Sequence, residues 1–289
     1  MPGESWSALR RLMAARRVLV NNALCLDEAR RLKPGEIVEV SVRAQSPPPT
    51  AADVRVLWLD TAVVVVDKPA GMTTLRHWAE RDWSSERKTR QPALDDVLPE
   101  LIARREHLER APAPNVFSVH RIDRETSGLL VFARTVLAQQ ALITKFKAHS
   151  VERTYLAVAQ GEVIAQTFES RLVEDRGDGR RGSTSLPGAG KRAVTHVRPL
   201  EYMAGWTLLE CRLETGRTHQ IRIHLSEAGH PVYGDSKYGP LSPSVEAGRT
   251  GRLALHAATL GIDHPSDGLR LSFESQPPKD FEELVARLR

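Results

Sequence analysis

The sequence predicts an α+β fold, because stretches typical of strands outnumber stretches typical of helices. Short apolar or alternating runs indicate strands, and apolar residues spaced by three and four indicate helices. Several of the runs alternate in the manner of an antiparallel sheet, so we expect a mixed or antiparallel sheet. The predicted strands are 54–59, 62–67, 128–132, 154–159, 207–213 and 220–225, and the predicted helices are 94–105, 136–146 and 281–288.

A small patterned region precedes this part of the chain. Residues 7–17 have the spacing of an amphipathic helix, and strand-like runs follow at 17–21 and 37–42. A run of prolines comes next, and such a run forms a stiff, extended linker. The predicted units are an N-terminal segment of residues 1–45, a Pro-rich linker of residues 46–52 and a main domain of residues 53–289.

Two further ranges have neither a strand pattern nor a helix pattern. Residues 76–91 are highly charged, so we expect an exposed loop there. Residues 175–191 are rich in glycine and in charged residues, so we expect either disorder or a loop that a ligand orders.

Composition narrows the class of protein. Lys plus Arg number 41 against 36 Asp plus Glu, and the net charge of +5 suggests a polyanionic partner. The basic start of the chain is also typical of organellar transit peptides, but here it continues directly into patterned structure. Two cysteines cannot form a disulfide framework, and no apolar run reaches the roughly 20 residues of a membrane helix. We therefore expect a cytoplasmic protein that does not associate with a membrane.

A cluster of charged and hydroxyl-bearing residues precedes the predicted strand 128–132. Residues 120–128 read HRIDRETSG. Asp123 lies between Arg121 and Arg124, and neighbouring cations favour the ionised form of a carboxyl group. Such a cluster suits a surface network of ion pairs as well as a catalytic site.

A second polar segment, residues 214–224, reads ETGRTHQIRIH. We expect a Thr-Gly turn that leads into a strand, in which Gln220, Arg222 and His224 would share one face. A third candidate is Tyr155 at the start of a predicted strand, although a tyrosine there also suits core or edge packing.

Other types of site find less support in the sequence. The histidines at 120, 219, 224, 230 and 256 have no spacing typical of metal ligands, and no Cys pair assists them. The sequence contains no glycine-rich phosphate loop and no G-x-S-x-G elbow of the serine hydrolases. We therefore expect neither a metal nor a nucleotide cofactor.

The segment HRIDRETSGLLVFAR resembles the signature HRLDxxTSGLLLxAK of the RluA-type pseudouridine synthases, with Ile122 in place of the usual Leu. The resemblance extends over residues 54–289, in the order of that family, through DTAVVVVDKPAG, ERTYLAVAQG, GKRAVTHVRPLE, LETGRTHQIRIHLSEAGHPVYGDSKYG and LALHAATL. The N-terminal segment resembles an S4 RNA-binding module through LRRLMAARRVLVNN and RLKPGEIVEV. We expect there either a trimmed S4 fold that contacts RNA phosphates or a cap on the catalytic domain.

The resemblance implies that the chain isomerises uridine to pseudouridine in RNA, without a cofactor or a metal. It implies that Asp123 is the catalytic carboxylate, that Arg222 holds it bidentately, and that Tyr155 packs on the target base and assists proton removal from C5. These residue types suit the roles: an Asp is ionised at neutral pH, the Arg fork matches a carboxylate, and a Tyr combines a stacking ring with a hydroxyl.

The resemblance also implies contacts with the substrate. A base in folded RNA must be flipped out before it reacts. We expect His120 and Arg121 to flank that nucleotide, with Arg121 filling the vacated space, because Arg stacks on bases and binds phosphates. The remaining expected substrate contacts are Arg217, Lys68, His219 and Gln220, of which the first two are expected to meet phosphate together with residues 76–91.

The identity of the RNA is less constrained by the sequence. Residues 76–91 and 175–191 match no family pattern and are the candidates for substrate choice. Ribosomal RNA is the favoured substrate and transfer RNA the alternative. A catalytically silent RNA-binding protein and a basic hydrolase are two further hypotheses, and the hydrolase needs a second carboxylate or a metal. Because no heptad pattern is present, we expect a monomer without an obligate protein partner.

Overall fold

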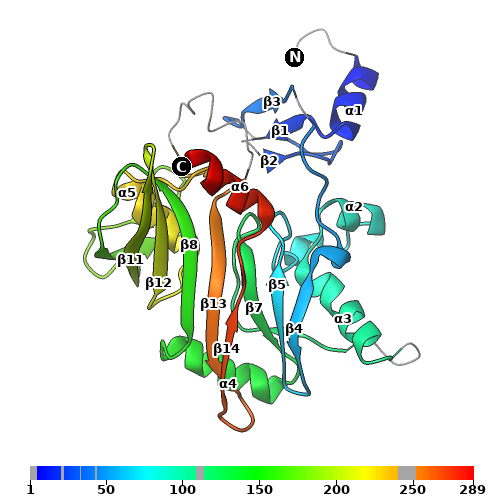
Figure 1. Ribbon diagram of the computed structural model, residues 1–289. Coiled ribbons are helices and arrows are strands. Elements are labelled where there is room, and N and C mark those ends of the chain that lie inside the picture. Colours follow the sequence, from blue (N-terminus) through cyan, green and yellow to red (C-terminus); the bar gives the residue numbers. More distant parts are fainter. Residues whose placement is uncertain (1–4, 21–22, 33, 43, 109–113, 240–251) are drawn as a thin grey trace.

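A computed structural model describes residues 5–20, 23–32, 34–42, 44–108, 114–239 and 252–289. Within these residues the chain forms a small three-stranded sheet near its N-terminal end and a large eleven-stranded sheet in the main domain (Figure 1). One large sheet with flanking helices confirms the predicted α+β class. None of the helices described is both long enough and apolar enough to cross a membrane.

The N-terminal segment consists of one helix and three short strands. Helix α1 (Trp6–Ala14) precedes β1 (Val18–Val20), β2 (Ala23–Leu24) and β3 (Val38–Val40). The strands are antiparallel and lie in the order β2-β1-β3. The helix and both strands expected for this segment are therefore present, whereas its identity as an S4 module stays a prediction.

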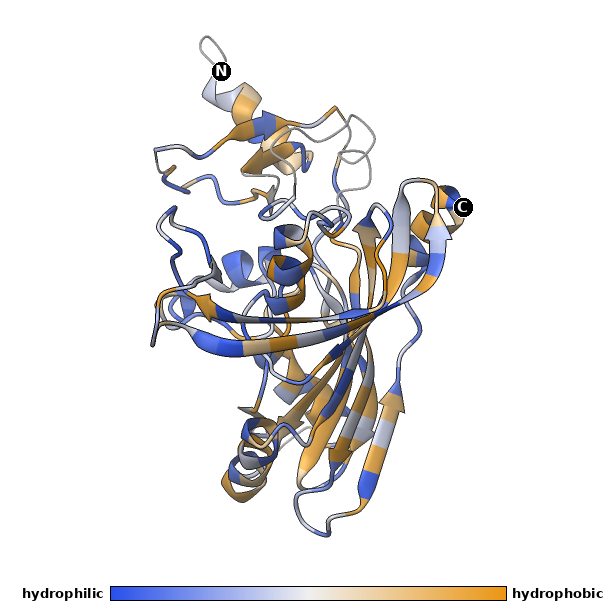
Figure 2. Cartoon of the chain, turned by 90° about the vertical axis from the view of Figure 1, so that its left-hand side faces the viewer, coloured by the Kyte–Doolittle hydropathy of each residue, from blue (hydrophilic) through white to orange (hydrophobic). Residues whose placement is uncertain are grey.

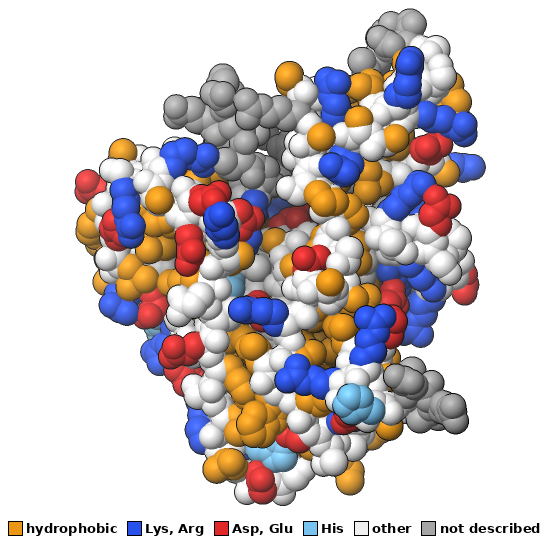
Figure 3. Space-filling view, turned by 45° about the vertical axis from the view of Figure 1, so that its right-hand side comes forward, with side chains coloured by type: hydrophobic (Ala, Val, Ile, Leu, Met, Phe, Trp, Pro, Cys, Tyr) orange, Lys and Arg blue, Asp and Glu red, His pale blue; other side chains and the backbone are white. Residues whose placement is uncertain are grey.

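Several arginines of the N-terminal segment are bonded within the segment itself. Their partners are carboxylate or carbonyl oxygens, so these guanidinium groups hold the small fold together. Lys and Arg side chains are spread over this upper part of the surface with apolar side chains between them (Figure 3). The pairs are Arg10 with Glu28 at 2.9 Å, Arg16 with the Gln45 carbonyl at 2.7 Å, Arg17 with the Ser41 carbonyl at 2.7 Å and Arg30 with Glu36 at 2.6 Å.

The charged range 76–91 is largely exposed, as predicted, but it is not a loop throughout. It contains the 3-10 turn η2 (Trp78–Glu80) and the helix α2 (Ser85–Arg90). Helix α2 has no apolar stripe, and its sequence therefore carries no periodic signal. Arg87 of α2 pairs with Asp27 at 2.6 Å, so this range contacts the N-terminal segment.

The large sheet is mixed, as predicted. Its strands lie in the order β10-β9-β11-β12-β8-β13-β7-β5-β4, and β14 pairs with β13 while β6 pairs with β7. Among these pairings β13 and β7 run parallel, and the others are antiparallel. The strands are β4 (Arg55–Leu59), β5 (Val63–Lys68), β6 (Phe117–Ser118), β7 (Ser127–Ala133), β8 (Glu152–Gln160), β9 (Gln166–Val173), β10 (Gly182–Ser183), β11 (Lys191–Met203), β12 (Trp206–Leu213), β13 (Leu255–Asp263) and β14 (Arg270–Glu274).

Helices cover both faces of the central strands. Val64 of β5 packs in one core cluster with Leu98 of α3, and its neighbour Val65 packs in a second cluster with Leu142 of α4. Strands buried on both faces read as continuous apolar runs, and orange segments run through the sheet in Figure 2, with blue segments among them. The helices of the main domain are η1 (Ala51–Asp53), η2, α2, α3 (Leu94–Arg105), α4 (Val136–Lys147), α5 (Gln220–Glu227) and α6 (Lys279–Leu288).

The Gly-rich range 175–191 lies against α5. Strand β10 within it pairs with β9, and Asp175 Oδ1 accepts the N–H groups of Gly177 and Gly179 at 2.8 and 2.9 Å. Arg176 then pairs with Glu227 at the end of α5, at 3.5 Å. These contacts contradict the disorder that the composition predicts.

The range 220–225 is helical, so the predicted strand is wrong. The alternation of polar and apolar residues in QIRIH matches a strand period by chance, because α5 is almost wholly buried and its apolar residues occupy several faces. Gln220 and His224 are four residues apart and share one face of the helix. Both reach Thr195 Oγ1, at 3.0 and 2.9 Å, while Arg222 contacts Asp123 instead.

Candidate active site

A cavity of about 450 Å³ lies where the loop before β7, the end of α4, the start of β8 and the turn before α5 meet. A volume of this size is typical of small-molecule sites. Cations dominate the charged groups of its wall, so the cavity favours an anionic ligand. The lining Lys and Arg residues are Arg121, Lys147, Arg153, Arg217 and Arg222, and the lining carboxylate is Asp123.

Asp123 is held in place by the chain segment that follows β5. Thr74 Oγ1 donates to the carbonyl oxygen of Ile122 at 2.7 Å and accepts the N–H of Ile122 at 3.3 Å. Gly128, in β7 just after the loop, has a φ of +110°, and a Cβ there would lie 2.2 Å from the carbonyl oxygen of Ala257. Glycine is therefore required for this loop to join β7 beside β13. Both contacts fix the backbone on either side of Asp123 at the cavity wall.

Arg222 of α5 connects two carboxylates. Its Nη1 donates to Asp123 Oδ2 at 2.9 Å, and its Nε and Nη2 donate to the two carboxylate oxygens of Asp235 at 2.7 and 2.8 Å. Burial lowers the pKa of Arg222, but the hydrogen bonds and charges of Asp235 and Asp123 outweigh burial and raise that pKa above its ordinary value. The expected pairing of Arg222 with Asp123 is present, whereas the bidentate contact is made with Asp235.

Asp235 is a residue of this site that sequence reasoning missed. Its Oδ1 also accepts the N–H groups of Lys237 and Tyr238, each at 2.9 Å. Burial raises the pKa of Asp235, but the hydrogen bonds and charge of Arg222 outweigh it and lower that pKa. The available signal was the segment GDSKYG, because an Asp that accepts N–H groups two and three residues later is typical of a turn.

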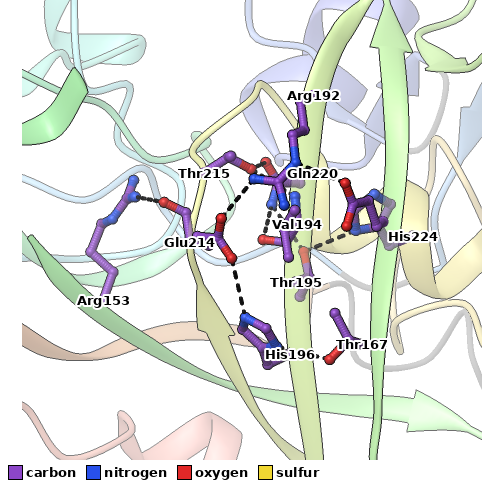
Figure 4. Close-up of polar contacts among 11 residues, drawn as sticks. Arg153, Thr167, Arg192, Val194, Thr195, His196, Glu214, Thr215, Gln220 and His224 are labelled. Carbon is purple, nitrogen blue, oxygen red and sulfur yellow. Dashed lines mark hydrogen bonds and ion pairs between the residues drawn. The ribbon is translucent and has the colours of Figure 1, made fainter. Parts of the chain in front are cut away.

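Gln220 shapes the turn before α5, and its amide is fully engaged. Its Oε1 accepts from Thr215 Oγ1 at 2.7 Å and from the N–H of Arg217 at 3.0 Å. Its Nε2 donates to the Val194 carbonyl at 2.9 Å and to Thr195 Oγ1 at 3.0 Å (Figure 4). All four hydrogen-bonding positions of the amide are used within the chain, and Gln220 also lines the cavity, so its contact with the substrate stays a prediction.

Tyr155 of β8 lines the cavity and is 8% exposed. Burial raises the pKa of Tyr155 to about 12, while Arg153 opposes the shift and Asp123 adds to it. The phenol is therefore protonated at neutral pH. It offers the cavity an aromatic face and a hydroxyl group, as the predicted role of Tyr155 requires.

His219 lies beside Asp123 in a strained conformation. Its φ of 59° is in the left-handed region, at the residue before α5. Its Nδ1 pairs with the Tyr238 hydroxyl at 2.8 Å, and its Nε2 lies 3.7 Å from Asp123 Oδ1. Burial lowers the pKa of His219 to about 4, so the imidazole is neutral at pH 7. Backbone strain of this kind occurs at functional sites, and His219 keeps its place as a candidate substrate-binding residue.

His120 and Arg121 are adjacent in sequence but have different environments. His120 Nε2 accepts the N–H of Val131 at 3.1 Å, and its ring stacks on Phe146 with the centroids 4.6 Å apart. Burial, with a smaller contribution from Arg153, lowers the pKa of His120 to about 3. Arg121 is exposed, and no hydrogen bond or ion pair engages its side chain within the part of the chain that the structure describes. His120 therefore supports the wall, whereas Arg121 is open to a ligand.

The structure contradicts the predicted phosphate contact of Lys68. This side chain is fully buried, and its Nζ donates to the carbonyl oxygens of Pro69, Met72 and Arg124 at 2.8, 2.7 and 3.2 Å. Burial lowers the pKa of Lys68 to about 7. An ammonium group surrounded by three carbonyl oxygens has no open side for a phosphate. Lys68 instead ties the segment after β5 to the loop that carries Asp123.

The chemistry of the lining points to one carboxylate among cations. Asp123 is the acidic side chain of the lining, so the second carboxylate that a paired-acid hydrolase needs is not among its residues. No group of three His, Cys, Asp or Glu side chains suited to a metal ion occurs in the described ranges. Arg217 also lines the cavity, and its Nε donates to the Arg192 carbonyl at 3.0 Å. A lone, oriented carboxylate of this kind suits nucleophilic catalysis on an anionic substrate.

Comparison with known proteins identifies the class of protein. Residues 62–227 match the family model described as RNA pseudouridylate synthase. The ribosomal large subunit pseudouridine synthase D of Neisseria meningitidis serogroup A is 38% identical over 269 residues, which are 88% of this chain and 67% of that protein. The RNA pseudouridine synthase YlyB of Bacillus subtilis is 36% identical, over 90% of this chain and 82% of that protein.

A solved structure shows the same fold. Human RNA pseudouridylate synthase domain containing 4 superposes with a TM-score of 0.64 at 25% sequence identity, over 81% of this chain and 92% of that one. The chain belongs to the RNA pseudouridylate synthase family and is an enzyme, an isomerase that acts on RNA. The family resemblance of the sequence motifs is thereby confirmed.

Proposed function

We propose that this enzyme converts uridine to pseudouridine in ribosomal RNA, with Asp123 as its nucleophile. The observation that carries the proposal is the pair of Asp123 and Arg222, 2.9 Å apart on the wall of a cation-lined cavity. Support for ribosomal RNA comes from relatives such as those of Neisseria meningitidis and Escherichia coli O157:H7, which are named ribosomal large subunit pseudouridine synthases.

The reaction requires the uracil to leave C1′ of the ribose and to return through C5. Attack of Asp123 on C1′ and a glycal intermediate are two routes, and both need an ionised and aligned carboxylate. Arg222 supplies the alignment through its hydrogen bond to Asp123 Oδ2. Because Asp235 binds the other side of the same guanidinium, Arg222 stays paired and in position when Asp123 changes charge.

Tyr155 provides a surface for the detached base. Its ring stacks on the uracil while C5 turns toward C1′. The hydroxyl is protonated at rest, since the pKa of Tyr155 is raised to about 12 by burial. Tyr155 therefore assists removal of the C5 proton only after its own proton has passed to another acceptor.

The RNA meets the enzyme at the cationic rim of the cavity. Arg121 is exposed there and fills the space that the flipped uridine leaves in the RNA, because a guanidinium stacks on bases. The N-terminal segment acts as a trimmed S4-like module that adds phosphate contacts. The enzyme works as a monomer, without a protein partner and in the cytoplasm.

Tritium release tests the substrate class. Transcripts labelled with 5-³H-uridine would be incubated with the enzyme, with large-subunit ribosomal RNA and a transfer RNA pool tested separately. We expect release from the ribosomal transcript, since C5 loses its hydrogen when it bonds to C1′. Release from transfer RNA alone would contradict the ribosomal assignment. Binding to both transcripts without release from either would favour the silent RNA-binding protein.

A further inference from the structure

Arg153 is a buried arginine whose charge has no carboxylate partner. It is the second residue of β8, is 7% exposed and lines the cavity, two residues from Tyr155 and thus on the same face of the strand. Its Nη2 donates to the Glu214 carbonyl at 3.2 Å (Figure 4), and its guanidinium lies 5.4 Å from the centre of the Phe146 ring. Nε is buried without a hydrogen-bond partner among the described residues.

Comparison with the other buried arginines shows that the lack of a carboxylate partner is unusual. Arg76 and Arg222 are 7% and 6% exposed, and each pairs with carboxylates. Arg153 forms no ion pair with any described residue and uses one of its five N–H groups. A buried charge without a counter-charge is costly, so such charges in proteins are normally paired. The buried and unpaired charge of Arg153 beside the cavity therefore points to an anionic ligand.

Gly216 lies directly beside the guanidinium of Arg153. A Cβ on Gly216 would lie 2.4 Å from Arg153 Nη1. The backbone of Gly216 is not in the left-handed region, so its conformation does not require glycine. The glycine instead provides the space in which Nη1 lies beside the cavity.

The geometry points to Arg153 as the binding residue for a phosphate group of the uridine nucleotide that enters the cavity. This inference rests on the proposed function, since it takes a uridine in RNA as the ligand. The phosphate is the formal anion that every such nucleotide carries, and an arginine binds it through charge-assisted hydrogen bonds. Arg217 lines the same cavity, so a phosphate bound by Arg153 has a second cation nearby. Asp123 then remains available to react at the ribose.

Equilibrium binding of three small probes tests the assignment without turnover. Uridine, uridine 5′-monophosphate and uridine 3′-monophosphate would be titrated against the full chain by NMR. We expect one of the monophosphates to bind wild type about tenfold or more tightly than uridine. Arg153→Met should remove this preference and leave the affinity for uridine unchanged. Gly216→Ala should weaken the same monophosphate, because the added Cβ displaces Nη1.

Arg198→Met is the matched control, because Arg198 is an exposed arginine that pairs with Glu210 away from the cavity. It should keep the preference for the monophosphate. A preference that survives in both Arg153→Met and Gly216→Ala would overturn the assignment and leave the proposed function intact. An equal loss for uridine and its monophosphates would overturn it in favour of a contact with the base. A wild type that binds neither monophosphate more tightly than uridine would also overturn the assignment, whereas the proposed function is tested separately by tritium release from RNA.

Discussion

The N-terminal segment and the cavity of the main domain are both rich in arginine, but they use these side chains differently. In the N-terminal segment Arg10, Arg16, Arg17 and Arg30 donate to oxygen atoms of the segment itself. In the cavity Arg121 and Arg153 have no carboxylate partner among the residues described. We therefore expect RNA contacts at the cations that remain unpaired, and not at every basic residue of a segment.

The two regions also differ in the size of their hydrophobic cores. The main domain buries long apolar stretches on both faces of β5 and β7, while the core of the N-terminal segment contains Val18, Val20 and Cys25. A small core contributes little stability on its own. We therefore expect catalysis and stability to depend on the main domain and to respond weakly to changes in the N-terminal segment.

Among the substitutions that test this difference between the two regions, we expect the largest effect on activity at Asp235. Asp235→Asn removes the charge that holds Arg222, so Arg222 and Asp123 lose their fixed alignment. We expect kcat to fall about 10- to 100-fold with little change in RNA affinity. Single-turnover kinetics with excess enzyme measure this. Asp267→Asn, at an exposed position 62% accessible, serves as the control. An unchanged kcat in Asp235→Asn would contradict a positioning role.

Substitutions in the cores of the two regions measure the difference in stability between them. Leu98→Ala empties part of the main core, where Leu98 is fully buried, and should lower the free energy of unfolding by about 2–5 kcal/mol. Val20→Ala in the N-terminal segment removes less apolar surface and should cost about 1–2 kcal/mol at most. Urea unfolding of both variants makes the comparison. Equal losses would contradict the expected difference in stability between the two cores.

Buried histidines make the main domain sensitive to acid. Burial lowers the pKa of His120 to about 3 and of His219 to about 4, below the value near 6.5 of an unfolded chain. Below pH 6.5 the unfolded chain binds protons that the native state does not, so the free energy of unfolding should fall as pH falls. Between pH 7 and pH 5 we expect His120 to account for about 2 kcal/mol. His120→Gln should reduce this loss in urea titrations at the two pH values. An equal loss in the variant would assign the acid sensitivity to other groups.

The smallest effect is expected in the N-terminal segment. Arg11 is exposed without a described side-chain partner, whereas Arg17 donates to the Ser41 carbonyl. Arg11→Ala should raise KM for ribosomal RNA about threefold at low salt and leave kcat unchanged, since a phosphate contact contributes to binding alone. Arg17→Ala should instead destabilise the segment in proteolysis. A KM that is unchanged in both variants would favour a cap over an RNA-binding module.

Much of the fold follows from local patterns in the sequence. The run 62–66 predicts β5 because a strand covered on both faces is apolar throughout, and the spacing of 94–105 predicts α3 because that helix buries one face. Helix α5 is one exception, and α2 in the charged range 76–91 is another. Helix α5 is buried on most sides, and a helix that is buried on most sides has no clear 3.6-residue pattern.

The sequence motifs predict which residues belong to the candidate site. They do not predict which of the side chains pair with one another. Asp123 and Arg222 are 99 positions apart, and only the family resemblance suggested that they meet. No local pattern shows that Lys68 is surrounded by carbonyl oxygens, or that Asp235 takes the bidentate contact of Arg222. These roles depend on which chain segments the sheet brings together, and sequence spacing does not encode that.

The pseudouridine content of the RNA tests most directly whether Asp123 performs the isomerisation. Large-subunit ribosomal RNA transcript would be incubated with excess enzyme, digested to nucleosides and analysed by liquid chromatography. Asp123→Asn should bind the transcript as wild type does and yield no pseudouridine, a loss of at least about 10³-fold. Glu125→Gln, in the same loop but outside the lining of the cavity, should retain activity. Pseudouridine formed by Asp123→Asn at the wild-type rate would contradict the account.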